Sequence, residues 1–231
     1  MNGSGSVSVI QDPQLDRLLA TLHAKSDAQL AALRDFDVRR ASQNPPSEEE
    51  IKQFRSDKFV ALDRDKAEFC YQLCRAIDAR RIVEVGTSYG VSTLYLAAAL
   101  RDNISQRGGQ GVVIGTEYEP KKAATARATF DDAGLAAHID LREGDLRETL
   151  RVIEGPVDFL LMDIWVKMAR PALQLVAPHL RQGAIIICDN TQSYRSDYAD
   201  YFAFLNDPAN GFRTMTLPFE GGLEFSVRHT A

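Results

Sequence analysis

The turn Gly86–Gly90, with the sequence GTSYG, combines residue types that could bind a ligand or carry out chemistry. It follows a short run rich in β-branched residues, Arg81–Val85, and it precedes a segment rich in Ala and Leu. A strand that ends in a glycine-rich turn before a helix offers unpaired backbone N–H groups to a nucleotide-like ligand. The glycines let the ligand approach the backbone closely. Hydrolysis, hydride transfer with a dinucleotide and reactions of S-adenosylmethionine (SAM) all use turns of this kind.

The hydrolase interpretation rests on a match between this turn and the pattern G-x-S-x-G, in which the serine is a nucleophile. Asp189 and His229 follow in the order that a catalytic triad would need. However, a nucleophile elbow follows a central strand with earlier strands beside it, whereas the segments before this turn have helical patterns. His229 is also the third residue from the end of the sequence, where chains tend to fray. These features disfavour a hydrolase.

The dinucleotide interpretation needs the spacing G-x-G-x-x-G, but three residues separate Gly86 from Gly90 here. Glu117 ends the second predicted strand, where an acidic residue can bind a ribose diol. That feature does not separate a nicotinamide or flavin dinucleotide from other adenosine ligands. The glycine spacing therefore disfavours a dinucleotide-dependent oxidoreductase.

SAM carries a ribose and an adenine but no pyrophosphate, so it does not require the third glycine. Its amino-acid end needs polar partners near the first turn, where Glu84 and the turn itself lie. Glu117 is available for the ribose, and Gly144-Asp145 follows the third predicted strand, where the adenine edge would lie. The pattern therefore favours SAM among the three ligands.

Alternating strands and helices are required to position these residues at one edge of a sheet. We predict a parallel sheet covered by helices on both faces, because apolar strand-like runs alternate with helical patterns from residue 81 onward. The predicted strands are 81–85, 112–117, 138–143, 157–163 and 183–189, with helices near 90–101, 120–134, 145–153, 168–180 and 197–205. The segments 212–218 and 223–228 flank a tight turn with two glycines, which predicts a terminal antiparallel hairpin.

The first 80 residues have only helical patterns. The small polar residues 1–11 are expected to be disordered, and Asp12-Pro13 is typical of the start of a helix. A break at 43–46 precedes a short helix, and a further helix is predicted over 63–78, with Phe69, Leu73 and Ile77 on one face. We expect an N-terminal helical extension over 1–57 and a second domain over 58–231.

Composition restricts the partners that the chain could have. The sequence is 45% hydrophobic and 26% charged, which is ordinary for a globular protein, and its net charge of −5 argues against a nucleic-acid partner. We find no apolar run near the roughly 20 residues that cross a bilayer, and the N-terminus does not resemble a signal peptide. We therefore expect no nucleic-acid or membrane partner and a cytoplasmic protein.

The three cysteines form no paired motif and are expected to be buried.

From about Lys58 to Arg228 the chain resembles the class I SAM-dependent O-methyltransferases of the catechol and caffeoyl-CoA type, especially their small bacterial members. The resemblance rests on six motifs in order: VEVGTSYGVST, VIGTEYEPKKAATARATFDDAGL, LREGD, VDFLLMDIW, LRQGAIIICDNT and TLPFEGGLEFSVR. It implies a doubly wound, mostly parallel seven-stranded α/β sheet, the Rossmann-like methyltransferase fold, with strand order 3-2-1-4-5-7-6.

The resemblance also implies a set of SAM-binding residues. Those that would surround the methionine portion are Glu84, Gly86, Ser88 and Gly90, with Ser92 nearby. Glu117 would bind the ribose hydroxyls. Tyr118, Asp145 and Leu146 would flank the adenine, and Asp163 would face the sulfonium methyl group.

A divalent metal is the second group that the resemblance implies. Asp163, Asp189 and Asn190 would supply two carboxylates and an amide oxygen, a donor set that suits Mg²⁺. Such an ion would bind an acceptor hydroxyl and lower its pKa. The alternative interpretation is ordinary turn chemistry, because Asp and Asn are common after strands.

The catalytic base of the family is displaced in this sequence. The family pattern is Asp, any residue, Trp, Lys, whereas this chain has Asp163-Ile164-Trp165-Val166-Lys167. A shift of one residue turns a helical side chain by about 100°, so we expect Lys167 to point away from the cofactor. Asp163, Trp165 and Lys167 remain the catalytic candidates, with Trp165 as a wall of the acceptor pocket.

These observations predict methyl transfer from SAM to a hydroxyl of a small, catechol-like acceptor, with a divalent metal. The alternatives are a metal-independent methyltransferase that acts on another atom, and a protein that binds SAM or S-adenosylhomocysteine (SAH) without catalysis. The segment 191–204 could supply aromatic walls for the acceptor, or its Tyr198, Tyr201 and Phe202 could be one apolar helix face. The N-terminal helices would cover the active site or form a homodimer.

Overall fold

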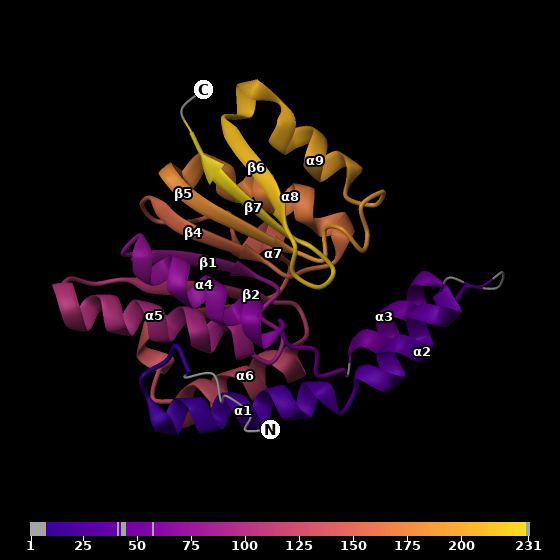
Figure 1. The fold of residues 1–231 in the computed structure, drawn as a ribbon, viewed down its shortest axis with the longest axis horizontal. Helices are drawn as coiled ribbons and strands as arrows, with labels where there is room; N and C mark the ends of the chain where they lie inside the picture. The colour runs from indigo at the N-terminus through magenta and orange to yellow at the C-terminus, as the bar shows by residue number, and fades with distance from the viewer. Residues whose placement is uncertain (1–7, 41, 43–44, 57, 230–231) are drawn as a thin grey trace, which may run out of the picture. The chain divides into compact units, whose positions relative to one another are not determined.

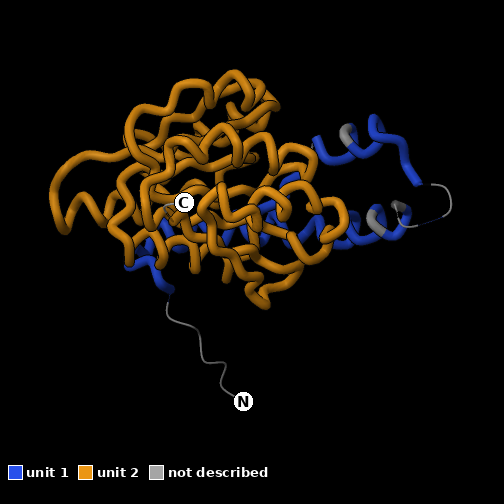
Figure 2. The backbone as a smooth tube through the Cα atoms, turned by 90° about the horizontal axis from the view of Figure 1, so that it is seen from above, with its two compact units in different colours: residues 1–61 blue, residues 62–231 orange. Residues whose placement is uncertain are grey.

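The computed structural model describes residues 8–40, 42, 45–56 and 58–229 and divides the chain into two compact units, 1–61 and 62–231 (Figure 2). The disorder predicted for the first residues falls in part on 1–7, and the predicted break falls in part on 43–44, both outside the described residues. The boundary at 57/58 that the sequence suggested between extension and second domain remains a prediction.

The first unit is helical. Its helices are α1 (Pro13–Asp27), α2 (Leu30–Arg40) and α3 (Glu48–Ser56). Asp12 caps α1 by accepting hydrogen bonds from two backbone N–H groups, and Pro13 occupies the first turn, as the sequence indicated. Ser47 and Glu50 form the reciprocal capping box at the start of α3.

In the described part of the second unit, seven strands form one sheet in the order β3-β2-β1-β4-β5-β7-β6 (Figure 1), which confirms the predicted fold. The strands are β1 (Arg81–Val85), β2 (Val112–Glu117), β3 (Ile139–Glu143), β4 (Val157–Met162), β5 (Leu180–Asp189), β6 (Phe212–Leu217) and β7 (Leu223–Arg228). The first five run parallel, whereas β7 lies antiparallel between β5 and β6. The carboxyl ends of the parallel strands therefore share one edge.

The helices of this unit lie on both faces of the sheet. They are α4 (Arg64–Ala76), α5 (Val91–Arg107), α6 (Pro120–Asp132), α7 (Leu146–Thr149), α8 (Val166–Val176) and α9 (Ala199–Asn206), with single 3₁₀ turns at 136–138, 177–179 and 208–210. The connection from β1 to β2 and the connection from β4 to β5 step across the sheet in opposite directions. Because both crossovers are right-handed in parallel sheets, α5 and α8 cover opposite faces.

Two predicted helices end earlier than the sequence suggested. The helix predicted over 168–180 is α8, which starts at Val166 and ends at Val176. Pro178 has no backbone N–H to donate to the preceding turn, so a 3₁₀ turn leads directly into β5. The helix predicted over 145–153 is the single turn α7.

The close approach of β1 and β4 depends on Gly86. Its φ of +97° favours glycine, and a Cβ there would overlap the backbone carbonyl oxygen of Asp163. The N–H of Asp163 donates to the carbonyl oxygen of Val85 at 3.1 Å, so two backbones meet where the turn begins. The sequence position after β1 therefore accepts no side chain.

We predict that Gly86→Ala destabilises the second unit by about 3 kcal/mol, since strain at positive φ and a backbone overlap act together. Gly134→Ala is the matched control, because Gly134 has a φ of +67° and nothing within 4 Å of its would-be Cβ. The control should cost about 1 kcal/mol, the cost of the left-handed region alone. Urea unfolding of both variants measures the difference, and equal losses would contradict this account of Gly86.

Candidate functional site

The turn between β1 and α5 forms the centre of the predicted site. Gly86, Ser88 and Gly90 all have positive φ, at 97°, 51° and 84°. A Cβ at Gly90 would overlap the ring of Phe130 on α6, so this glycine lets α5 begin close to α6. The turn therefore presents backbone at the carboxyl edge of the sheet, as the glycine spacing predicted.

Glu84 is fully buried within β1, and its carboxylate accepts hydrogen bonds from hydroxyl groups of the turn and of α5. Thr87 Oγ1 donates at 2.9 Å and Ser92 Oγ at 2.6 Å, and Thr93 Oγ1 donates as well. Burial raises the pKa of Glu84 despite these hydrogen bonds. The Glu84 side chain thus links the Gly86–Gly90 turn to the start of α5. It therefore positions the Gly86–Gly90 turn.

Glu117 ends β2 beside the turn, with 8% of its surface exposed. Its Oε2 accepts the backbone N–H of Ser88 at 2.7 Å, and its Oε1 accepts the N–H of Glu119 at 2.8 Å. Each carboxylate oxygen can accept a further hydrogen bond. The carboxylate is thus fixed in direction and still able to accept from the hydroxyls of a ribose.

The residues predicted to flank the adenine differ in exposure. Tyr118 is 61% exposed, whereas Leu146 is buried. Asp145 caps α7 through the backbone N–H of Arg147, and it also pairs with the Arg147 guanidinium. These hydrogen bonds lower the pKa of Asp145 to about 2. Asp145 is therefore a cap as well as a candidate for the adenine edge.

Asp163 follows β4, next to the Gly86 turn, and Trp165 lies two residues later with 49% of its surface exposed. Burial raises the pKa of Asp163, and the negative charges of Asp189 and Glu84 raise it further. Lys167 is exposed in the first turn of α8, which begins at Val166. The structure thus keeps Asp163 and Trp165 at the edge of the sheet, with Val166 where the family has its lysine.

Asp189 ends β5 and is almost completely buried, at 5% exposure. Its Oδ1 lies 2.8 Å from Nζ of Lys66, and its Oδ2 accepts a hydrogen bond from Nδ2 of Asn190 at 2.7 Å. Lys66 Nζ also lies 2.7 Å from Oδ2 of Asp63. Burial lowers the pKa of Lys66, but the charges of Asp189 and Asp63 outweigh this effect and raise it overall, so the side chain is an ammonium at neutral pH.

The metal site predicted at Asp163, Asp189 and Asn190 remains a prediction, and Lys66 already pairs with one of its carboxylates. Asp189 already carries an internal cation, and Asn190 turns its nitrogen, which is not a ligand, toward Asp189. Within the described ranges, no three side chains of the types His, Cys, Asp and Glu gather where they could hold an ion. Mg²⁺ needs several oxygen ligands and an uncompensated negative charge. Lys66 compensates the charge of Asp189, which disfavours an ion at that carboxylate.

Lys66 is the site residue that sequence reasoning missed. The buried stripe of α4 is Lys66, Ala67, Cys70, Tyr71 and Cys74, whereas the predicted face of Phe69, Leu73 and Ile77 is only half-buried. The sequence did contain one sign of this residue, because Lys66 is spaced to lie on the same helix face as the apolar residues of α4. Its partner Asp189 lies far away in the sequence, so no local pattern could have identified the pair.

Tyr198, Tyr201 and Phe202, the aromatic side chains considered as acceptor walls, are buried in the core beneath α9. The apolar-face interpretation is therefore confirmed for these three side chains. The same segment does contribute Gln192 and Arg195 to a hollow of about 430 Å³, together with Thr216–Pro218.

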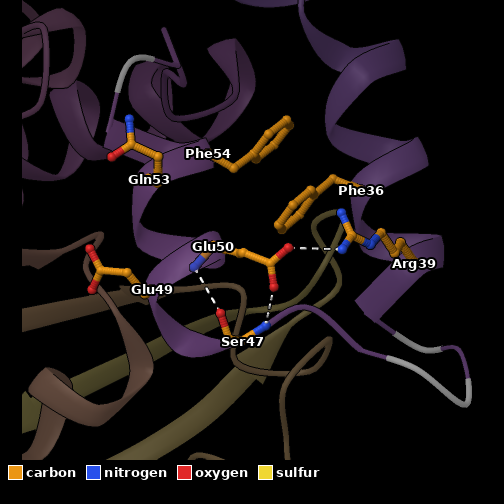
Figure 3. Close-up of a pocket in the computed structure, with 7 residues that line it drawn as sticks. All are labelled: Phe36, Arg39, Ser47, Glu49, Glu50, Gln53 and Phe54. Atoms are coloured by element: carbon orange, nitrogen blue, oxygen red, sulfur yellow. Dashed lines mark hydrogen bonds and ion pairs between the residues drawn. The ribbon is translucent and has the colours of Figure 1, made fainter.

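Another hollow, of about 640 Å³, belongs to the first unit and lies between α2 and α3 (Figure 3). The rings of Phe36 and Phe54 stack there at 3.9 Å, and Arg39 pairs with Glu50 at 2.9 Å. The side chains that line it are Phe36, Arg39, Ser47, Glu49, Glu50, Gln53 and Phe54. None of the residues predicted to bind the cofactor or a metal is among them.

Part of the second unit is similar to a known protein family. Residues 83–191 match a family described as a methyltransferase domain. The chain is 33% identical over 132 residues to catechol O-methyltransferase from Mycobacterium tuberculosis, an alignment that covers 57% of each chain. It is 31% identical over 139 residues to catechol O-methyltransferase from Niastella koreensis, covering 57% of this chain and 58% of that protein. The chain thus matches less than two thirds of the length of these curated relatives.

Solved structures share the fold over nearly the whole chain. Cofactor-bound Rv0187 from MTB superimposes with a TM-score of 0.70 at 24% identity, covering 97% of this chain and 94% of that one. The O-methyltransferase from Bacillus cereus in complex with SAH gives a TM-score of 0.67 at 20% identity, covering 96% and 93%. The resemblance predicted from the sequence motifs is confirmed as a similarity: residues 83–191 match a methyltransferase domain, and the chain is similar in sequence to catechol O-methyltransferases and in fold to solved O-methyltransferases.

Proposed function

We propose that the protein transfers the methyl group of SAM to a hydroxyl of a small aromatic acceptor. The observation that carries this proposal is the convergence of the Gly86–Gly90 turn, Glu117 and Asp163 at one edge of the sheet. The match of residues 83–191 to a methyltransferase domain supports SAM as the ligand of that edge. In the reaction, the acceptor oxygen forms a bond to the methyl carbon as the sulfur–carbon bond breaks. SAH and the hydroxyl proton are released.

In this proposal each group acts through its position. The turn and Ser92 hold the amino-acid end of SAM, Glu117 binds the ribose, and Tyr118, Asp145 and Leu146 border the adenine. Asp163 lies beside the sulfonium methyl group, and the exposed ring of Trp165 offers a flat surface to a planar acceptor. Orientation of the two reactants is the main contribution of the protein to such a transfer.

Several finer points are part of the proposal. The names of the curated relatives support a catechol-like acceptor. The Lys66–Asp189 ion pair favours the metal-independent alternative over Mg²⁺, which the sequence suggested. The predicted homodimer and cytoplasmic location remain predictions. In the part of the chain that the structure describes, no helix has the length and apolar character needed to cross a membrane.

Calorimetry with SAH tests the proposed ligand, and transfer from labelled SAM to a panel of phenols and catechols tests the reaction. We expect one SAH per chain and a methylated phenolic product. A protein that takes up no SAH would contradict the proposal. Tight SAH binding without transfer to any acceptor would indicate the non-catalytic alternative.

We predict that Glu117→Gln weakens SAH binding about tenfold or more, because a charged acceptor for the ribose hydroxyls is lost. The control is Glu154→Gln, an exposed residue before β4 at the opposite edge of the sheet. It should leave the dissociation constant within about twofold of the unsubstituted protein. Similar weakening in both variants would show that Glu117 has no specific part in cofactor binding.

We also predict that Lys167→Ala lowers turnover by less than tenfold. A general base contributes about 10²–10⁴-fold, and Lys167 is an exposed side chain one position beyond the family's lysine. Steady-state rates with the best acceptor of the panel measure the effect. A thousandfold loss would show that Lys167 does act as the base.

A further inference from the structure

Lys66 is a fully buried cation beside the proposed acceptor site. It belongs to the first turn of α4, and its side chain is 1% exposed. A buried ammonium is costly unless it is paired and hydrogen-bonded. Here Asp63 and Asp189 provide the pairing, at 2.7 and 2.8 Å from Nζ. Helix α4 thus places one positive charge, the Lys66 ammonium, next to the end of β5.

The two partners of Lys66 differ in their surroundings. Asp63 has 53% of its side chain exposed, so water screens its charge. Asp189 is 5% exposed, and its second oxygen is already bonded to Asn190. The interaction of Lys66 with Asp189 is therefore the stronger of the two, because screening is weaker in the interior. Removing Lys66 would leave Asp189 as an uncompensated buried charge.

Asp163 shares this environment. The positive charge of Lys66 opposes the effects of Asp189 and Glu84 on the Asp163 carboxyl, so Lys66 also acts on the end of β4. Without an internal cation, a developing phenolate between Asp163 and Asp189 would meet negative charge alone. One ammonium thus offsets the carboxylates on both strand ends.

We propose that Lys66 is a built-in cation that takes the place of a divalent metal in this domain. The inference rests on the proposed methyl transfer and adds a statement about its acceptors. Lys66 is a positioning residue, since its charge acts through Asp189 and its own surface is covered. An internal ammonium cannot be chelated by a vicinal diol as a metal ion can. The acceptor therefore needs one phenolic hydroxyl and not two.

Binding of Mn²⁺, followed by electron paramagnetic resonance, tests the inference on the SAH-loaded full chain. Mn²⁺ serves as the probe because it takes the oxygen ligands that Mg²⁺ takes. We expect no Mn²⁺ binding at micromolar concentrations and no loss of methyl transfer in EDTA. Binding of Mn²⁺ with micromolar affinity would overturn the inference while SAH binding still supported the proposed function. Failure to bind SAH would overturn the proposed function, and the inference with it.

Substitution of Lys66 gives the matched test. Lys66→Met removes the charge at similar length, so we expect Mn²⁺ affinity to rise at least tenfold as Asp189 loses its internal cation. The gain should disappear in the double variant Lys66→Met/Asp189→Asn. Lys66→Gln, which keeps a hydrogen-bond donor, replaces Lys66→Met if the latter does not fold. A folded variant with no gain in Mn²⁺ affinity would overturn the inference.

The acceptor preference is measured with phenol and catechol as probes. We expect the ratio of kcat/KM between catechol and phenol to stay within about tenfold, because chelation contributes nothing to binding. The ratio should not change when EDTA is added. A strict requirement for the vicinal diol that EDTA abolishes would overturn the inference.

Discussion

The contact between the backbones of Gly86 and Asp163 is the constraint on which the candidate site depends. Parallel strands joined by right-handed crossovers bring their carboxyl ends to one edge, but side chains usually keep the turns apart. At Gly86 the missing Cβ lets the turn after β1 lie directly on Asp163, the residue that follows β4. The proposed cofactor turn and the proposed acceptor site are consequently neighbours. Direct transfer of a methyl group requires this, because the acceptor oxygen must contact the methyl carbon of the cofactor.

Four acidic residues gather at this edge, and three of them are stabilised in different ways. Hydroxyl groups surround Glu84, backbone N–H groups fix Glu117, and Lys66 pairs with Asp189. Burial raises the pKa of Asp163, and the charges of Asp189 and Glu84 raise it further. Because Glu84, Glu117 and Asp189 each have their own partners, the edge can hold these charges without a shared ion. The fixed dipoles and the ammonium are in place before any ligand arrives, which is the condition for electrostatic preorganisation.

The same edge shows how the chain departs from the family pattern. Val166 stands where the family has a lysine, and Lys66 enters from a different helix. In this chain the buried positive charge comes from α4 and pairs with Asp63 and Asp189.

The sequence by itself determined the alternation of strands and helices, the cofactor turn and the terminal hairpin, because these depend on local periodicity and on glycine spacing. It also indicated that Asp163 and Asp189 lie at the ends of two strands. The tertiary structure alone decided that Lys66 meets Asp189, that α8 stops before Pro178, and that the aromatic side chains of α9 are core. The pairing of Lys66 with Asp189 joins residues 123 positions apart in the sequence. Local patterns carry no information about such a contact, since only the packing of α4 beside the end of β5 creates it.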